Sequence, residues 1–323
     1  MARRKSKCYS GIGGQAVLEG VMMKNQEKYA VAVRKANGEI EVELENYQGV
    51  LHGNRLKEIP FIRGIFNFID SMILGMKCLN YSASFDEEAD EPGRSSGGKG
   101  EKLMTALVTV LAVVLAVGIF IVLPYYLSSL FQERIHNASL IAIMEGVIRI
   151  IIFILYVWGI SAMKDIKRLY RYHGAEHKCI NCIEKGRPLT VRNVMRSSRL
   201  HRRCGTSFIF FVMFVSIILF FFIRVEHPVQ RVALRILLMP VVAGISYEII
   251  RLAGRSDNLF VRIISAPGMW IQRMTTKEPD RKMAEVAIAA VEAVFDWRKF
   301  LYDNFGYVAE ETYTEGEEQE SGQ

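Results

Sequence analysis

Two histidines and a glutamate in one short segment, with a further histidine and a cysteine later in the chain, have the types and spacing of a metal site. His173 and His177 are four residues apart, so on a helix both imidazoles lie on one face and reach one cation. Glu176 stands between them as a general base for a bound water. This H-x-x-E-H order is that of the inverted zinc peptidases. His201 and Cys204 precede the next apolar segment and complete a set of candidate ligands.

The first interpretation of these residues is a catalytic site. His173 and His177 bind a divalent metal, expected to be zinc, and His201, Cys204 or a carboxylate supplies the third ligand. Such a site keeps one coordination position open for water. It predicts a hydrolase, and both a peptide bond and a lipid ester remain open as its substrate.

The alternative interpretation is a structural site. Cys179 and Cys182 would join His201 and Cys204 around zinc in a C-x2-C and H-x2-C pairing. Four protein ligands leave no vacancy for chemistry. A site of this kind would only fold the segment that carries it.

Glu248 is the next residue that bears on chemistry, because it lies inside an apolar segment. An unpaired charge there costs roughly 2.5 to 3.5 kcal/mol, so the side chain is expected to point inward. Either Glu248 is a distant metal ligand, or it forms an ion pair with Arg149 or Arg251.

The elements that position these residues are predicted to be membrane-spanning helices. Half of the 323 residues are hydrophobic, and they gather in long runs with few charges. About 20 apolar residues cross the hydrocarbon core as a helix. Four runs qualify: Leu103–Leu130, Leu140–Met163, Ser207–Ile223 and Val232–Ile250. The fold class predicted is therefore a mainly α integral membrane protein, with its membrane domain at 103–255.

Charge predicts the orientation of these spans. The segment 164–206, expected to be a loop, holds twelve Lys or Arg between Lys164 and Arg203 against three acidic residues. By the positive-inside rule this segment and the metal motif are cytoplasmic, and an even number of spans makes both termini cytoplasmic. The basic start Met1–Lys7 is followed by no apolar core, so no signal peptide is expected. The five cysteines would then lie in a reducing compartment as thiols or ligands.

Four further regions are predicted outside the membrane. Residues 1–85 form a small α+β region, in which Tyr29–Arg34 and Glu39–Leu44 pair as a hairpin. There, Gly11–Gly14 is expected to be a tight turn, and Pro60–Leu79 a helix along the membrane interface or against the bundle. Residues 86–102 are predicted to be a flexible linker. Residues 256–308 hold C-terminal helices, and 309–323 is an acidic tail too polar to fold.

The predicted C-terminal helix begins after Pro279 and has one apolar face. That face is formed by Met283, Val286, Ala287, Ala290, Val291 and Val294. The helix must pack against another part of the chain.

Several motifs, in chain order, resemble those of the bacterial YqhQ family, domain-of-unknown-function family 1385. They are Gly13–Met23, His173–Lys178, Leu200–Ser207, Ser246–Arg251 and Thr275–Pro279, followed by Glu285–Ile288. The resemblance covers almost the whole chain. It implies a metal-dependent multi-pass protein of the bacterial plasma membrane and names no substrate. Arg202 replaces a proline common in the family, and Cys179 and Cys182 lie outside its pattern, which favours the histidine ligand set.

A non-enzymatic function is the competing prediction. The basic segment 164–206 would bind anionic membrane lipid. The same surface would suit an adaptor that docks a ribosome, a translocon or another protein, with any metal purely structural.

Overall fold

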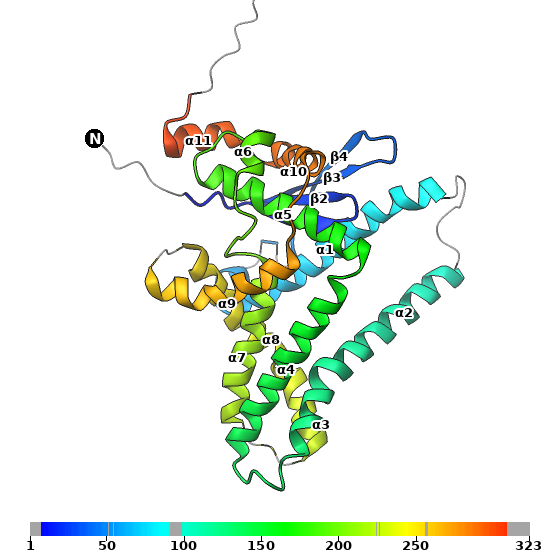
Figure 1. Ribbon diagram of the computed structural model, residues 1–323, viewed down its shortest axis with the longest axis vertical. Helices are drawn as coiled ribbons and strands as arrows, with labels where there is room; N and C mark the ends of the chain where they lie inside the picture. The colour runs from blue at the N-terminus through cyan, green and yellow to red at the C-terminus, as the bar shows by residue number, and fades with distance from the viewer. Residues whose placement is uncertain are drawn as a thin grey trace, which may run out of the picture.

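The computed structural model describes residues 8–50, 52–53, 55–90, 99–223, 225, 227–255 and 258–308. Figure 1 shows a helical bundle with a second layer above it, in which a small sheet and several short helices gather. The candidate metal residues lie where the two layers meet.

The helical bundle contains four segments long and apolar enough to cross a membrane, as the sequence predicts. Their bounds are Ala106–Ser129, Ser139–Ile160, Gly205–Phe222 and Val229–Ala253. The first segment is made of α2 (Lys99–Val117), a π-helical stretch η2 (Gly118–Val122) and α3 (Leu123–Ser129), and the others belong to α4 (Ala138–Ile160), α7 (Gly205–Phe222) and α8 (Pro228–Arg255).

The sheet has four antiparallel strands in the order β1-β2-β3-β4. They are β1 (Gly13–Val17), β2 (Gly20–Asn25), β3 (Lys28–Arg34) and β4 (Ile40–Asn46). The predicted hairpin is confirmed as β3 and β4, with Arg34 opposite Ile40. Its turn needs Gly38, whose φ of +91° is in the region that favours glycine.

The prediction of a turn at Gly11–Gly14 is wrong in its second half, because Gly13 and Gly14 belong to β1. Gly14 lies where a side chain would collide with its surroundings: an added Cβ would be 2.7 Å from Met22 O. β2 is buried on both faces for four residues. It therefore lacks the alternation of polar and apolar residues that reveals a strand.

The predicted C-terminal helix is confirmed as α10 (Arg281–Val294), which begins with the Asp280 carboxylate accepting from Met283 N at 2.9 Å. All six residues of its predicted apolar face are buried. The helix packs against the sheet and against α5 (Lys164–Glu184). Together these elements form the largest apolar core of the sheet layer, which α11 (Trp297–Phe305) completes.

The segment 164–206, predicted to connect two spans as a loop, is largely helical. α4 ends at Ile160, a short turn follows, and α5 then runs for 21 residues as a separate helix. After it come α6 (Val191–Met195) and an irregular stretch that reaches α7. Polar residues occupy much of the buried face of α5, among them Glu176, His177 and Lys178.

The helix predicted at Pro60–Leu79 is confirmed, but α1 (Ile62–Asp90) is longer and follows a short turn η1 (Arg55–Glu58). It crosses α8 closely, since a Cβ on Gly64 would lie 2.8 Å from Tyr247 Cβ. The first residues of the predicted linker 86–102 are helical in α1 and its last ones in α2, while 91–98 lie outside the described residues, as does the predicted tail. The helix α9 (Leu259–Thr275) is one of the C-terminal helices expected in 256–308, although its bounds were not predicted.

Candidate metal centre

Three potential metal ligands converge where α5 meets the start of α7. His173 and His177 share one face of α5 with ring centroids 4.4 Å apart, and Cys204 is the N-cap residue of α7. His173 Nε2 lies 3.0 Å from Cys204 Sγ. The ligand atoms of the three residues all lie within 4.8 Å of one another. One ion of the size of Zn²⁺, with Zn–N of about 2.0 Å and Zn–S of about 2.3 Å, fits between donors so spaced.

Backbone carbonyl groups fix the orientation of both imidazoles. His173 Nδ1 lies 2.9 Å from Thr275 O, and His177 Nδ1 lies 2.6 Å from Arg199 O. A carbonyl oxygen only accepts hydrogen bonds, so each Nδ1 carries a proton, and a ring in the neutral form that a metal needs has its lone pair on Nε2. This is the usual support of a metal-binding histidine. His177 Nε2 is buried and has no hydrogen-bond partner within the described structure.

A close approach of two segments delivers the carbonyl group of Thr275. The chain around 275–279 lies against α5, and Lys277 N donates to Tyr170 O at 2.8 Å. Gly174 permits this contact, because a Cβ there would lie only 2.0 Å from Lys277 O. The motif His-Gly-Ala-Glu-His therefore contains a glycine for a packing reason.

The side chain of Cys204 lies in a positive environment. Burial alone would raise the pKa of its thiol, but His173 and His177 outweigh burial and hold that pKa well below its ordinary value. Burial also lowers the pKa of His173, and the adjacent Cys204 more than compensates, raising it to about 9. The pair thus favours a thiolate, the form in which cysteine binds metals.

Glu176 lies beside the three ligands and is 5 % exposed. Its side chain packs against β1, where a Cβ on Gly14 would lie 2.9 Å from Glu176 Cγ. Among the residues that the structure describes, no hydrogen bond or salt bridge to its carboxylate is found. Burial raises the pKa of Glu176, and the nearby histidines lower it in part.

His201 lies next to this group but is directed elsewhere. Its ring centroid is 5.7 Å from that of His177. Its Nε2 lies 3.6 Å from Glu184 Oε2 and 3.1 Å from an Arg203 guanidinium nitrogen. Burial lowers the pKa of His201 to about 4 although Glu184 raises it. The structure thus places His201 with Glu184, a residue that the sequence did not single out.

Glu248, predicted to be a ligand or an ion-pair partner, forms ion pairs. It accepts from Arg63 Nε at 2.7 Å and from Arg63 Nη2 at 2.5 Å, and Arg251 lies 3.9 Å away. Arg149, the other predicted partner, pairs with Glu145. The structure does not bring Glu248 to the three converging ligands.

The four-ligand alternative is not assembled in the described part of the chain. Cys179 and Cys182 are fully buried in the apolar core around α5. Cys182 Sγ points to Pro188 O at 3.4 Å. Burial raises the pKa of Cys182 to about 11 and that of Cys179 well above its ordinary value. Within the described residues, the one group of three or more metal-ligand side chains is His173, His177 and Cys204.

Comparison with known proteins identifies the family of the chain. A profile for the family described as "Protein of unknown function (DUF1385)" matches residues 59–297. The chain belongs to this family. It is 36 % identical over 293 residues to "Uncharacterized protein YqhQ" of Bacillus subtilis (strain 168), covering 88 % of this chain and 92 % of that protein. No solved structure matches it significantly.

Proposed function

We propose that this chain is a metal-dependent hydrolase of the membrane, with zinc held by His173, His177 and Cys204. The observation that carries the proposal is the buried, unpartnered Nε2 of His177 in the described structure, held by Arg199 O and directed at the same space as the other two ligands. A buried nitrogen without a partner is costly, and a cation removes this cost.

The donor set fits zinc. Two neutral imidazoles and one thiolate are ligands that zinc prefers, and catalytic sites are known with two cysteines and one histidine or with three histidines. Three protein ligands leave one position open. A metal held in this way supplies a Lewis acid that activates water or polarises a carbonyl group.

The chain's own residues supply the rest of the proposed chemistry. Thr275 O and Arg199 O keep the two imidazoles in one tautomer and orientation. Glu176 is the proposed general base, because it lies beside the ligands and its carboxylate is held by no other described side chain. Its raised pKa, caused first by burial, keeps the proton affinity that such a base needs.

One observation favours a second function, a structural metal in a membrane adaptor. Glu176, His177 and Cys204 are 5 %, 1 % and 7 % exposed, so a substrate reaches the centre only if a neighbouring segment moves. The basic surface proposed for a partner is smaller than the sequence suggests, because Lys178 and Arg203 are turned inward to carbonyl groups and Glu184. Arg192, Arg196 and Arg281 line an open groove on the surface of the protein.

The metal assignment is tested by zinc content of the purified protein. His177→Ala should remove most of the zinc, because an open three-ligand site cannot spare one ligand. The matched control is Cys182→Ser on the same helix, which should keep it. Equal loss in both variants would favour the four-ligand structural site. A zinc-free wild type would overturn the metal assignment and leave Cys204 and His173 as a thiolate–imidazolium pair.

The enzyme assignment is tested separately, by rescue of a deletion strain. Glu176→Gln should keep zinc and fold but fail to rescue, because the amide has nearly the same shape and accepts no proton at neutral pH. An adaptor predicts the reverse: rescue by Glu176→Gln, and failure when Arg192, Arg196 and Arg281 are replaced together by Gln.

A further inference from the structure

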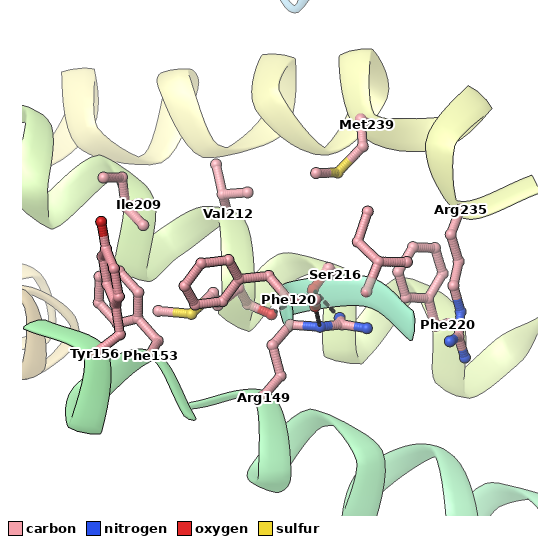
Figure 2. Close-up of a pocket in the computed structure, with 12 residues that line it drawn as sticks. Phe120, Arg149, Phe153, Tyr156, Ile209, Val212, Ser216, Phe220, Arg235 and Met239 are labelled. Atoms are coloured by element: carbon pink, nitrogen blue, oxygen red, sulfur yellow. Dashed lines mark hydrogen bonds between the residues drawn. The ribbon is translucent and has the colours of Figure 1, made fainter. Parts of the chain in front are cut away.

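A pocket of about 260 Å³ lies inside the bundle between η2, α4, α7 and α8 (Figure 2), and none of the three metal ligands lines it. Its volume is close to the lower end of the range for small-molecule sites, roughly 300 to 1,000 Å³. Most of the lining is aromatic or aliphatic. The lining includes Phe120, Phe153, Val212, Met239, Arg149 and Arg235.

The sequence of the first span explains why the pocket forms here. Pro124 has no N–H, so the carbonyl group four residues earlier, that of Phe120, loses its α-helical donor. The helix is π-helical at this point, and Arg149 Nε donates to Phe120 O at 2.9 Å. Above the break, α2 leans away from the other helices (Figure 1), and the most apolar window of this span is not buried inside the protein. The pocket therefore has a side that lipid can reach.

A buried cluster of three charges borders the pocket. Arg149 and Arg235 both donate to Glu145, Arg149 Nη2 at 2.8 Å and Arg235 Nη2 at 2.6 Å. These residues are 3 to 8 % exposed, and among the described residues no second carboxylate pairs with either arginine. The cluster carries a net charge of +1, two arginines against one glutamate, in an apolar segment. Such a charge is costly without a counter-anion.

The two guanidinium groups also have donors to spare. Each carries five N–H bonds, and the hydrogen bonds to Phe120 O, Ser216 Oγ and Glu145 account for five of the total. In Figure 2 the Arg149 guanidinium lies between the apolar walls of the pocket, next to Ser216. An anion at the end of an apolar chain would neutralise the net charge and accept hydrogen bonds from the remaining guanidinium donors.

We propose that this pocket binds a long-chain carboxylate, a free fatty acid, with its alkyl chain between the aromatic walls and its carboxylate at Arg149 and Arg235. A carboxylate carries a single charge and so neutralises the cluster. A phosphate monoester carries roughly −1.5 to −2 and would overcompensate it, whereas a phosphodiester headgroup also carries one charge but brings two acyl chains to a pocket of about 260 Å³. The site needs no metal and is independent of the proposed hydrolase.

The test measures binding to the full-length protein in nanodiscs of phosphatidylcholine. Palmitate should bind at least about tenfold more tightly than hexadecanol, which has the same chain and no charge, because charge-assisted hydrogen bonds form only with the acid. Dioleoyl phosphatidylglycerol, an anion with two chains, should not displace palmitate. Equal affinities of palmitate and hexadecanol, or displacement by the phospholipid at equal concentration, would overturn the assignment.

Two substitutions that fill the pocket locate the binding. Val212→Trp on α7 and Met239→Trp on α8 should each lower palmitate affinity by about tenfold or more. The matched controls are Phe214→Trp and Leu237→Trp, two residues away on the same helices and exposed on the outside of the bundle. Equal loss in a filling variant and its control, or unchanged binding in both filling variants, would place the fatty acid elsewhere. Arg235→Gln should abolish the preference for palmitate over hexadecanol.

Discussion

Replacing Gly174 by alanine sets two physical effects against each other. Gly174 lies in the middle of α5, where helix propensity alone favours alanine by roughly 1 kcal/mol. The added Cβ, however, would lie 2.0 Å from Lys277 O and 3.5 Å from Pro279 Cδ. Ordinary contact requires the 275–279 segment to retreat by roughly 1 Å or more.

The consequences differ for stability and for metal binding. Overpacking costs about 1 to 3 kcal/mol, so the propensity gain leaves a net destabilisation of about 0 to 2 kcal/mol. The retreat also takes Thr275 O away from His173 Nδ1. In the wild type these two atoms lie 2.9 Å apart. Loss of such a supporting hydrogen bond lowers metal affinity by about 10- to 100-fold. Zinc affinity is therefore the more sensitive measurement.

The assay is competition for zinc with a chromophoric chelator on the detergent-purified protein, together with thermal unfolding. The matched control is Gly159→Ala in α4, where an added Cβ meets nothing within 4 Å. The control should bind zinc as the wild type does and unfold no earlier. If Gly174→Ala also keeps the wild-type zinc affinity, the 275–279 segment does not support His173, and the argument from the close approach is wrong.

Three further predictions concern the side chain of Gln272, the orientation of the spans and the reactivity of the cysteines. Gln272→Leu should destabilise the protein by about 3 kcal/mol in chemical denaturation, because the buried backbone N–H and C=O of His201 lose their partners at 2.9 and 2.6 Å. An impermeant thiol reagent should label His136→Cys and not Lys185→Cys in intact cells, and the opposite pattern would reverse the proposed orientation. Iodoacetamide at neutral pH should modify Cys204 only after zinc is chelated. Burial raises the pKa of the two α5 cysteine thiols, so they should stay unreactive until the protein unfolds. Mass spectrometry of the peptides distinguishes these outcomes.

Features that depend on local sequence were predicted correctly. The four apolar segments, the β3–β4 hairpin and the buried face of α10 each follow from the composition or periodicity of one short stretch. The same holds for the convergence of His173 and His177, since helical spacing alone places both on one face. Cys204 was predicted among the ligands because the chain must return to the bundle just after it.

Features that depend on distant partners were not predicted. Glu248 pairs with the predicted Arg251, but its nearer partner is Arg63, 185 residues earlier, and nothing near Arg63 indicates that pairing. The carbonyl groups of Arg199 and Thr275 carry no sequence signal at all, because every residue has one. The full extent of α5 was not predicted either: its buried polar residues are satisfied by other segments, such as Lys178 by Met195 O and Ser197 O.

The position of the centre limits which experiments separate its two proposed functions. Its ligands come from α5 and the start of α7, and its supporting carbonyl groups from 199 and 275, so the same contacts join the sheet layer to the bundle. Removing the metal should therefore lower stability whether it is catalytic or structural, because binding free energy becomes folding free energy. Glu176 differs from the ligands, since its carboxylate forms no hydrogen bond within the described structure. Its replacement by Gln changes acid–base chemistry and leaves those joining contacts intact, which makes it the variant that decides between an enzyme and a scaffold.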